Sequence, residues 1–108
     1  MKSIRIALFM SALLGIVGSG IVASAQAGDA ANGQKLYTAQ KCNICHQIAG
    51  KGGKMGPELT KVGTKRDAAW LKGYLPNPKS IDPKNKMPVV KLAGKDMDDL
   101  IAYLLSLK

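Results

Sequence analysis

The chain has 108 residues, 46% of them hydrophobic, and its 16 lysines and arginines against 7 acidic residues give a formal net charge of +9. This length holds a single domain, which excludes a large enzyme with a separate substrate domain, a repeat array and a protein with several membrane spans. Lysines supply most of the positive charge and no nucleic-acid-binding motif is present. We therefore expect an acidic partner protein and no nucleic acid.

Residues 1–27 have the three-part pattern of a secretory signal peptide. A short positive start is followed by the apolar stretch Ile6–Val22, and two overlapping Ala-x-Ala sites end at Ala25 and Ala27. We predict cleavage after Ala25 or Ala27, which leaves a domain of residues 28–108 in the periplasm. The alternative is an uncleaved leader that anchors the domain in the inner membrane, because about 18 apolar residues suffice to cross a bilayer.

A first helix is predicted from about Asp29 to Lys41. Asp29 is a favourable N-cap. The residues that share one face of this helix are Gly33, Leu36 and Tyr37. The helix ends where the chain reaches its only two cysteines.

These cysteines belong to the motif Cys42-Asn43-Ile44-Cys45-His46, which is the attachment signature of c-type haem. Thiols three residues apart share one side of a helical turn, so they can form thioethers with the two vinyl groups along one haem edge. The imidazole of His46, the only histidine in the chain, is then held under the iron as its proximal ligand. The sequence therefore predicts one haem c, attached covalently through Cys42 and Cys45.

Three other interpretations of this motif lack support elsewhere in the sequence. A disulfide between Cys42 and Cys45 would close a very small loop and stabilise the fold little. A zinc site would have three ligands here and no second Cys or His pair to complete its tetrahedron. A thioredoxin-like redox pair belongs in a βαβ context, and no strands of useful length are visible.

A second helix begins with Asp67 as its N-cap and ends before Pro76. The segments 50–63 and 76–92 are rich in glycine, proline and lysine. Long loops in so small a domain indicate that they wrap around something other than each other.

The loop after the second helix carries Met87, which we predict as the sixth ligand of the iron. Met55 follows His46 too closely to reach the other haem face, and Met97 lies on the apolar stripe of the third helix, where a core role is expected. Met87 lies far downstream in a proline-rich loop that can cross to the other face. Histidine–methionine ligation raises the reduction potential and suits electron transfer.

A third helix is predicted after Gly94. Asp96, Asp98 and Asp99 fill its first turn, where the helix dipole favours them. Its apolar stripe consists of Met97, Leu100, Ile101 and Leu104. With three helices and no repeats, the predicted fold class is all-α.

These residues resemble class I cytochrome c, and the likeness covers residues 28–108. The segment from Asp29 to Tyr37 is similar to the family's first helix, and Gly56-Pro57 is similar to its Gly-Pro turn. The stretch that begins Tyr74-Leu75-Pro76 and the later Lys86-Met87 pair resemble mitochondrial members, with the same interval from the tyrosine to the ligand methionine. The segment between Pro57 and Tyr74 is shorter than in those members, so the chain resembles the short bacterial ones. No tryptophan matches their propionate-binding position, and whether Trp70 replaces it stays open.

The resemblance implies specific contacts around the haem. The carbonyl of Pro57 would accept the Nδ1 hydrogen of His46, which fixes the tautomer and makes the imidazole a better ligand. The hydroxyl of Tyr74 would lie near the sulfur of Met87, and Leu75 would cover the haem. Gly33 would let the first and last helices cross closely, with Tyr37 packing against Leu100 and Tyr103.

The sequence thus predicts a cytochrome c fold with three main helices and Gly/Pro-rich loops wrapped around one covalent haem. The expected function is that of a soluble, monomeric one-electron carrier, and not an enzyme, between periplasmic or membrane-bound redox partners. These partners would be reductases or oxidases with acidic surfaces, because by resemblance Lys41, Lys79 and Lys86 lie near the exposed haem edge. The alternatives are a haem-based sensor or peroxidase-like protein, which would need an open distal site, and a lysine-rich interaction module without haem.

Overall fold

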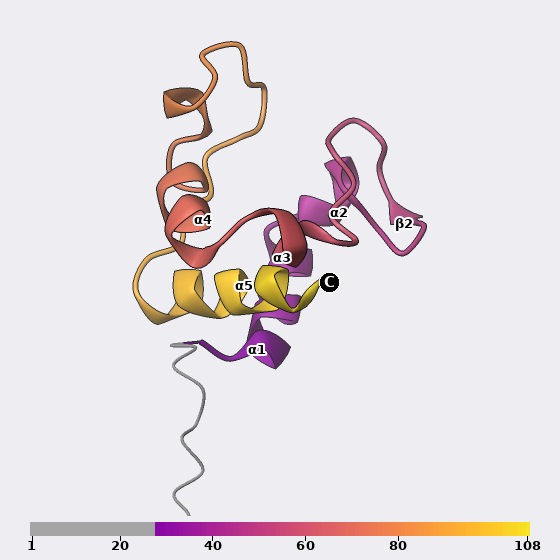
Figure 1. Cartoon of the computed structure of the whole chain (residues 1–108), viewed down its shortest axis with the longest axis vertical. Coiled ribbons are helices and arrows are strands. Elements are labelled where there is room, and N and C mark those ends of the chain that lie inside the picture. The colour runs from indigo at the N-terminus through magenta and orange to yellow at the C-terminus, as the bar shows by residue number, and fades with distance from the viewer. Residues whose placement is uncertain (1–27) are drawn as a thin grey trace, which may run out of the picture.

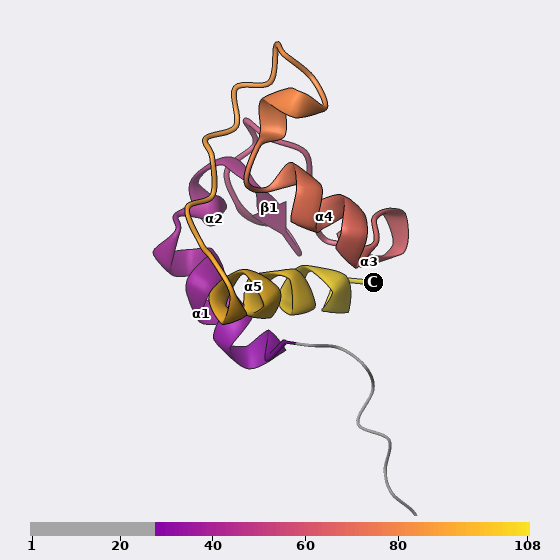
Figure 2. The same ribbon diagram turned by 90° about the vertical axis from the view of Figure 1, so that its left-hand side faces the viewer.

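The computed structural model describes residues 28–108, and the predicted signal peptide lies outside the described residues. Figures 1 and 2 show short helices joined by long loops. Within residues 28–108 the five α-helices are α1 (Ala30–Ala39), α2 (Cys42–Cys45), α3 (Val62–Lys65), α4 (Ala68–Tyr74) and α5 (Lys95–Ser106). The other elements are strands β1 (Gln47–Ile48) and β2 (Lys51–Gly52) and the 3-10 helix η1 (Pro78–Ser80). Within residues 28–108, none of the helices is long and apolar enough to cross a membrane.

The three predicted helices are confirmed as α1, α4 and α5. The side chain of Asp29 caps α1, and that of Asp67 caps α4 by accepting a hydrogen bond from the Trp70 backbone N–H at 2.8 Å. Helix α1 ends earlier than predicted, at Ala39. The reason is that Lys41 adopts a left-handed backbone conformation (φ 60°) and becomes the N-cap of α2.

Sequence reasoning missed the antiparallel hairpin of β1 and β2. Its register pairs Gln47 with Gly52 and Ile48 with Lys51. The turn residues Ala49 and Gly50 both have positive φ (50° and 81°), which matches the twist that a two-residue hairpin turn requires. Strands of two residues are too short to show an alternating pattern, so only this turn could have revealed them.

The core forms where α1 crosses α5, with α4 packed against the same helix (Figures 1 and 2). A Cβ atom at Gly33 would lie 1.9 Å from the backbone oxygen of Asp99, so only glycine permits the observed approach. The ring of Tyr37 packs edge-on against Tyr103, with centroids 5.6 Å apart. The predicted crossing of the first and last helices is therefore confirmed. The buried apolar cluster consists of Tyr37, Val62, Leu71, Leu75, Val90, Met97, Leu100, Ile101 and Leu104.

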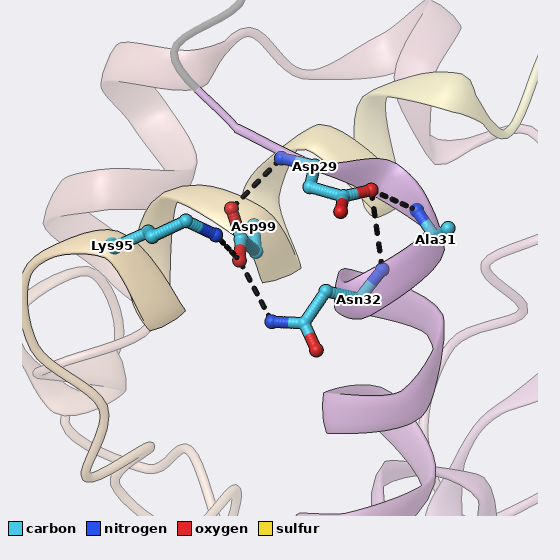
Figure 3. A network of polar contacts seen from close by, with 5 residues as sticks. All are labelled: Asp29, Ala31, Asn32, Lys95 and Asp99. Carbon is cyan, nitrogen blue, oxygen red and sulfur yellow. Dashed lines mark hydrogen bonds and ion pairs between the residues drawn. The ribbon is translucent and has the colours of Figure 1, made fainter.

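A buried carboxylate also joins these two helices (Figure 3). Asp99 is 0% exposed and accepts hydrogen bonds from the Asp29 backbone N–H at 2.8 Å, the Asn32 side-chain amide at 2.7 Å and Lys95 Nζ at 2.6 Å. These donors, the Asp29 N–H first, lower the pKa of Asp99 to about 2. The carboxylate is therefore charged at neutral pH and connects the start of α1 to α5.

The segment between α4 and α5 forms a long loop that returns to its starting point. It passes through η1, and at its base the Val90 N–H donates to the Leu75 carbonyl at 3.0 Å. In Figure 1 this loop extends from the end of α4, while α2 and the hairpin lie on the other side of the molecule.

Candidate haem site

A cavity of about 700 Å³ lies between the Cys-x-x-Cys-His segment and the loop that follows η1. This volume is typical of sites for small-molecule ligands and cofactors. Six of the seven predicted site residues line it: Cys42, Cys45, His46, Pro57, Tyr74 and Met87. The chain thus brings together residues from two segments that are far apart in the sequence.

Helix α2 presents the two cysteines. It is a single turn that begins and ends with them, so both thiols lie on one side of the helix, as the motif spacing predicts. Both cysteines are free and partly buried, which does not support the disulfide interpretation. Burial raises the pKa of the Cys42 thiol. Among residues 28–108, no group of three or more His, Cys, Asp or Glu side chains could hold a metal ion such as zinc.

His46 follows α2 in an extended conformation and is 9% exposed. Its Nδ1 lies 2.7 Å from the carbonyl oxygen of Pro57, the contact that the resemblance implies. Because a carbonyl only accepts, Nδ1 carries the hydrogen in this bond, and Nε2 is left with a free lone pair. This is the tautomer that can bind iron through Nε2.

Gly56 lies directly against the same imidazole ring. A Cβ atom at this position would lie 2.7 Å from His46 Cε1, and the Gly56 N–H donates to the Cys45 carbonyl at 2.7 Å. The absence of a side chain therefore lets the Gly-Pro turn approach the ring and hold its orientation.

The loop wall of the cavity carries Met87 beside two polar partners. The Met87 N–H donates to Asn85 Oδ1 at 2.8 Å, and Asn85 Nδ2 donates to the hydroxyl oxygen of Tyr74 at 2.5 Å. Met87 itself is half-buried and packs against the apolar core. Sequence reasoning missed Asn85, although an Asn two residues before the predicted ligand is a pattern for a local side-chain turn.

Two other methionines, Met97 and Met55, lie within residues 28–108. Met97 is buried in the core at 5% exposure. Met55 borders the cavity, but its side chain is 87% exposed. Met87 is thus the methionine that combines a place on the cavity wall with partial burial.

Leu75 and Trp70 lie away from the lining of the cavity. Leu75 is 5% exposed and belongs to the apolar cluster, so its contact with the haem stays a prediction. The Trp70 ring stacks on the Tyr74 ring, with centroids 4.5 Å apart. The guanidinium of Arg66, which precedes α4, lies 4.0 Å from the centroid of the Trp70 ring. Trp70 therefore packs against the ring of Tyr74 without lining the cavity.

The donor set of the cavity fits a covalent haem. It offers two free thiols on one helical turn, an imidazole whose Nδ1 is already bonded and a thioether sulfur from a separate loop. Apolar side chains, among them Ile44, Val89 and Val90, complete the lining. Thiols, imidazole and thioether are the groups by which proteins hold c-type haem.

The sequence comparisons agree with this assignment. The family model described as Cytochrome c matches residues 30–108. Cytochrome c2 of Rhodomicrobium vannielii is 33% identical over 96% of this chain and 95% of that protein. Subunit 2 of the cytochrome c oxidase of Alkalihalophilus pseudofirmus is 32% identical over 70% of this chain, but the match spans only 25% of that subunit.

The solved structures give the same result. Ferric cytochrome c-550 from Paracoccus versutus has a TM-score of 0.57 and 29% identity, covering 74% of this chain and 98% of that one. SoxXA from P. pantotrophus has a TM-score of 0.65 over 75% of this chain and 82% of that one, and at 22% identity it shows a shared fold alone. The predicted cytochrome c fold is confirmed, and this chain belongs to the cytochrome c family.

Proposed function

We propose that this cytochrome c carries single electrons in the periplasm, with His46 and Met87 as the two axial ligands of its haem iron. The observation that supports this most directly is that both residues, from separate segments, line the same cavity as the two cysteines. Members of the family carry electrons, and the axial ligands are the part of the proposal specific to this chain.

Haem c is held covalently by Cys42 and Cys45 and supplies the reversible one-electron change of its iron. The protein residues around the cavity determine how strongly the iron is ligated and what surrounds it. Pro57 fixes the His46 tautomer through the 2.7 Å bond, which makes Nε2 a stronger donor. Tyr74 lines the cavity together with Met87, and Leu75 belongs to the buried apolar cluster against which both side chains pack.

A ligand at each axial position argues against the sensor and peroxidase-like alternatives. Such proteins need an open distal site with polar groups, and His46 is the only histidine in the chain. Membership of the cytochrome c family also removes the alternative of a lysine-rich module without haem.

The proposed location rests on the leader pattern of residues 1–27 and on the similarity to cytochrome c2. Cleavage after Ala25 or Ala27 would release residues 28–108 into the periplasm, whereas an uncleaved leader would tether them to the inner membrane. The N-terminal sequence of the purified holoprotein distinguishes these outcomes.

The proposed partners are acidic reductases or oxidases that dock a monomer of this protein at the cavity mouth. Lys41 and Lys86 line the haem cavity. Lys79, Lys84 and Lys86 line a neighbouring cavity of about 570 Å³ on the same loop. Asp82 is the acidic residue of these two linings, so positive charge predominates around the haem cavity, and it would attract an acidic surface.

The test of the axial ligation is Met87→Ala. We expect a folded protein with covalent haem that loses the weak near-infrared absorption band of iron–sulfur ligation and binds carbon monoxide when reduced. Its reduction potential should fall by on the order of 100 mV, a modest part of the roughly 0.8 V range that axial ligands span.

Met55→Ala is the matched control, because Met55 borders the same cavity but is exposed. It should keep both the band and the potential. Loss of the band in Met55→Ala instead, or carbon monoxide binding by the wild type equal to that of Met87→Ala, would show that Met87 is not the ligand.

A further inference from the structure

Asn85 connects the loop that carries Met87 to the side of helix α4. Its amide makes two hydrogen bonds in opposite directions: Oδ1 accepts from the Met87 N–H at 2.8 Å, and Nδ2 donates to the Tyr74 hydroxyl at 2.5 Å. The first bond is a local turn that sets the backbone just before Met87, and the second joins residues 11 positions apart. Asn85 is half-buried and lines the haem cavity.

The two bonds together determine the orientation of the amide. A backbone N–H can only donate, so the atom that faces Met87 is the oxygen and the atom that faces Tyr74 is the nitrogen. The amide nitrogen occupies a lone pair of the phenol oxygen, and the phenolic hydrogen is left free to point elsewhere. Asn85 thereby leaves Tyr74 as a hydrogen-bond donor on the cavity wall.

Tyr74 is a firm anchor for this bridge. Its ring stacks on Trp70 at 4.5 Å with an interplanar angle of 15°, and Trp70 lies under the Arg66 guanidinium. By contrast, most of the loop from Pro76 to Val89 is exposed. Its base is closed by the Val90–Leu75 backbone bond, so Asn85 is the side chain that ties the loop to α4 next to Met87.

We infer that Asn85 is a positioning residue that holds Met87 at the iron, by bridging the Met87 backbone to the Tyr74 hydroxyl. This inference rests on the proposed ligation by Met87. Without the bridge, the loop loses its tie to α4, and a competing ligand displaces the methionine more easily. Asn85 itself does not bind the iron.

The experiment measures how tightly free imidazole binds to the ferric holoprotein, followed by the visible absorption spectrum. Imidazole must displace Met87, so its affinity reports how firmly the loop holds the methionine. Asn85→Ala removes both hydrogen bonds and should tighten imidazole binding by roughly ten-fold, which corresponds to about 1.4 kcal/mol.

Two variants separate the bridge from a general loosening of the loop. Asn77→Ala is the control, because the Asn77 side chain makes no hydrogen bond within residues 28–108; only its backbone atoms do. This variant should bind imidazole as the wild type does. Asn85→Asp keeps an oxygen that accepts from the Met87 N–H, and its second oxygen can accept the free hydrogen of the Tyr74 hydroxyl. The bridge is therefore preserved, and the imidazole affinity should stay within about threefold of wild type.

A double-mutant cycle tests whether Asn85 acts through Tyr74. In a Tyr74→Phe background the bridge to α4 is already broken, so adding Asn85→Ala should tighten imidazole binding by only about threefold. Circular dichroism of each holoprotein establishes that the variants are folded.

The outcomes separate this inference from the proposed function. If Met87→Ala retains the near-infrared band, the ligation itself is wrong. If that band behaves as expected but Asn85→Ala binds imidazole like the wild type, only the positioning role is wrong. The positioning role is also wrong if Asn77→Ala tightens imidazole binding as much as Asn85→Ala does. The same holds if Asn85→Asp tightens it as much as Asn85→Ala does.

Discussion

Among single residues, Asp99 combines complete burial with three hydrogen-bond donors. Because these donors stabilise the charged form, its pKa falls from the ordinary value of 3.8 to about 2. A lowered pKa in the folded state means that the stabilising contribution is complete above the ordinary value. It is lost as the pH falls through about 2.

Replacing this carboxylate with an amide tests its role directly. Asp99→Asn sets an amide nitrogen against Lys95 and the Asn32 amide, so we expect Tm to fall by about 10 °C near neutral pH. Thermal unfolding followed by circular dichroism at several pH values gives the measurement. Between the ordinary pKa of 3.8 and about 2, Tm should decline less steeply in the variant than in the wild type.

Asp96→Asn is the control for this change. Asp96 is exposed in the first turn of the same helix and differs from Asp99 in lacking burial. Its replacement should move Tm by no more than about 2 °C, as surface substitutions usually do. If the Tm of Asp99→Asn and that of the wild type decline in parallel as the pH falls, the Asp99 carboxylate does not control acid stability.

Single residues of the site were predictable where chemistry restricts the residue type. Thioether attachment requires cysteines at this spacing followed by histidine, so Cys42, Cys45 and His46 follow from the sequence alone. The roles of Asn85 and Asp99 were not predictable, because an amide in a loop or a carboxylate in a helix is usually exposed to solvent. Their functions depend on partners such as Tyr74 and Asn32, which only the folded chain brings near.

At the scale of elements, the helices α1 and α5 are held together through a glycine. In most helices alanine is more favourable than glycine by about 1 kcal/mol. At Gly33 this preference is reversed, since an added Cβ would lie 1.9 Å from the Asp99 carbonyl oxygen and 2.7 Å from Tyr103 Cβ. The packing of these two helices therefore requires the least helix-favouring residue other than proline.

Gly33→Ala and Gly73→Ala form a matched pair that tests this conclusion. Gly73 lies in α4, and an added Cβ there meets nothing within 4 Å. We expect Gly33→Ala to lower the free energy of unfolding by about 3 kcal/mol through overpacking. Gly73→Ala should raise it by about 0.5–1 kcal/mol. Urea unfolding of the two holoproteins measures both, and a change of the same sign in both would contradict the close crossing.

Element boundaries were predictable where a side chain marks them. Asp29 and Asp67 indicated the starts of α1 and α4 because carboxylates cap helices. The end of α1 was placed too late, since nothing in the sequence requires a left-handed lysine at position 41. That conformation separates α1 from α2.

At the scale of the whole molecule, the sequence predicts that the long loops surround a bound group, because so small a domain has few large apolar side chains of its own. The cavity between α2 and the Met87 loop has the size for a cofactor. What the sequence could not supply is the position of charge around that cavity. Lysines are dispersed along the chain, and only the fold brings Lys41 and Lys86 to the same cavity.

This distribution predicts that charge steers partners to one face. Lys41 and Lys86 line the haem cavity and Lys79 lines the adjoining one, whereas Lys51, Lys54 and Lys61 line neither. Replacing Lys41, Lys79 and Lys86 with Glu should slow the second-order rate of oxidation by an acidic partner, or by the polyanion ferricyanide, by on the order of ten-fold or more at low salt. The difference should shrink as salt screens charges beyond about 8–10 Å.

The triple replacement of Lys51, Lys54 and Lys61 changes the net charge equally and should slow the reaction much less. Stopped-flow kinetics over a range of ionic strengths, with the potential of each variant measured separately, gives the comparison. Equal slowing by both triples would mean that net charge alone governs the encounter, because a local docking face must depend on where the lysines lie.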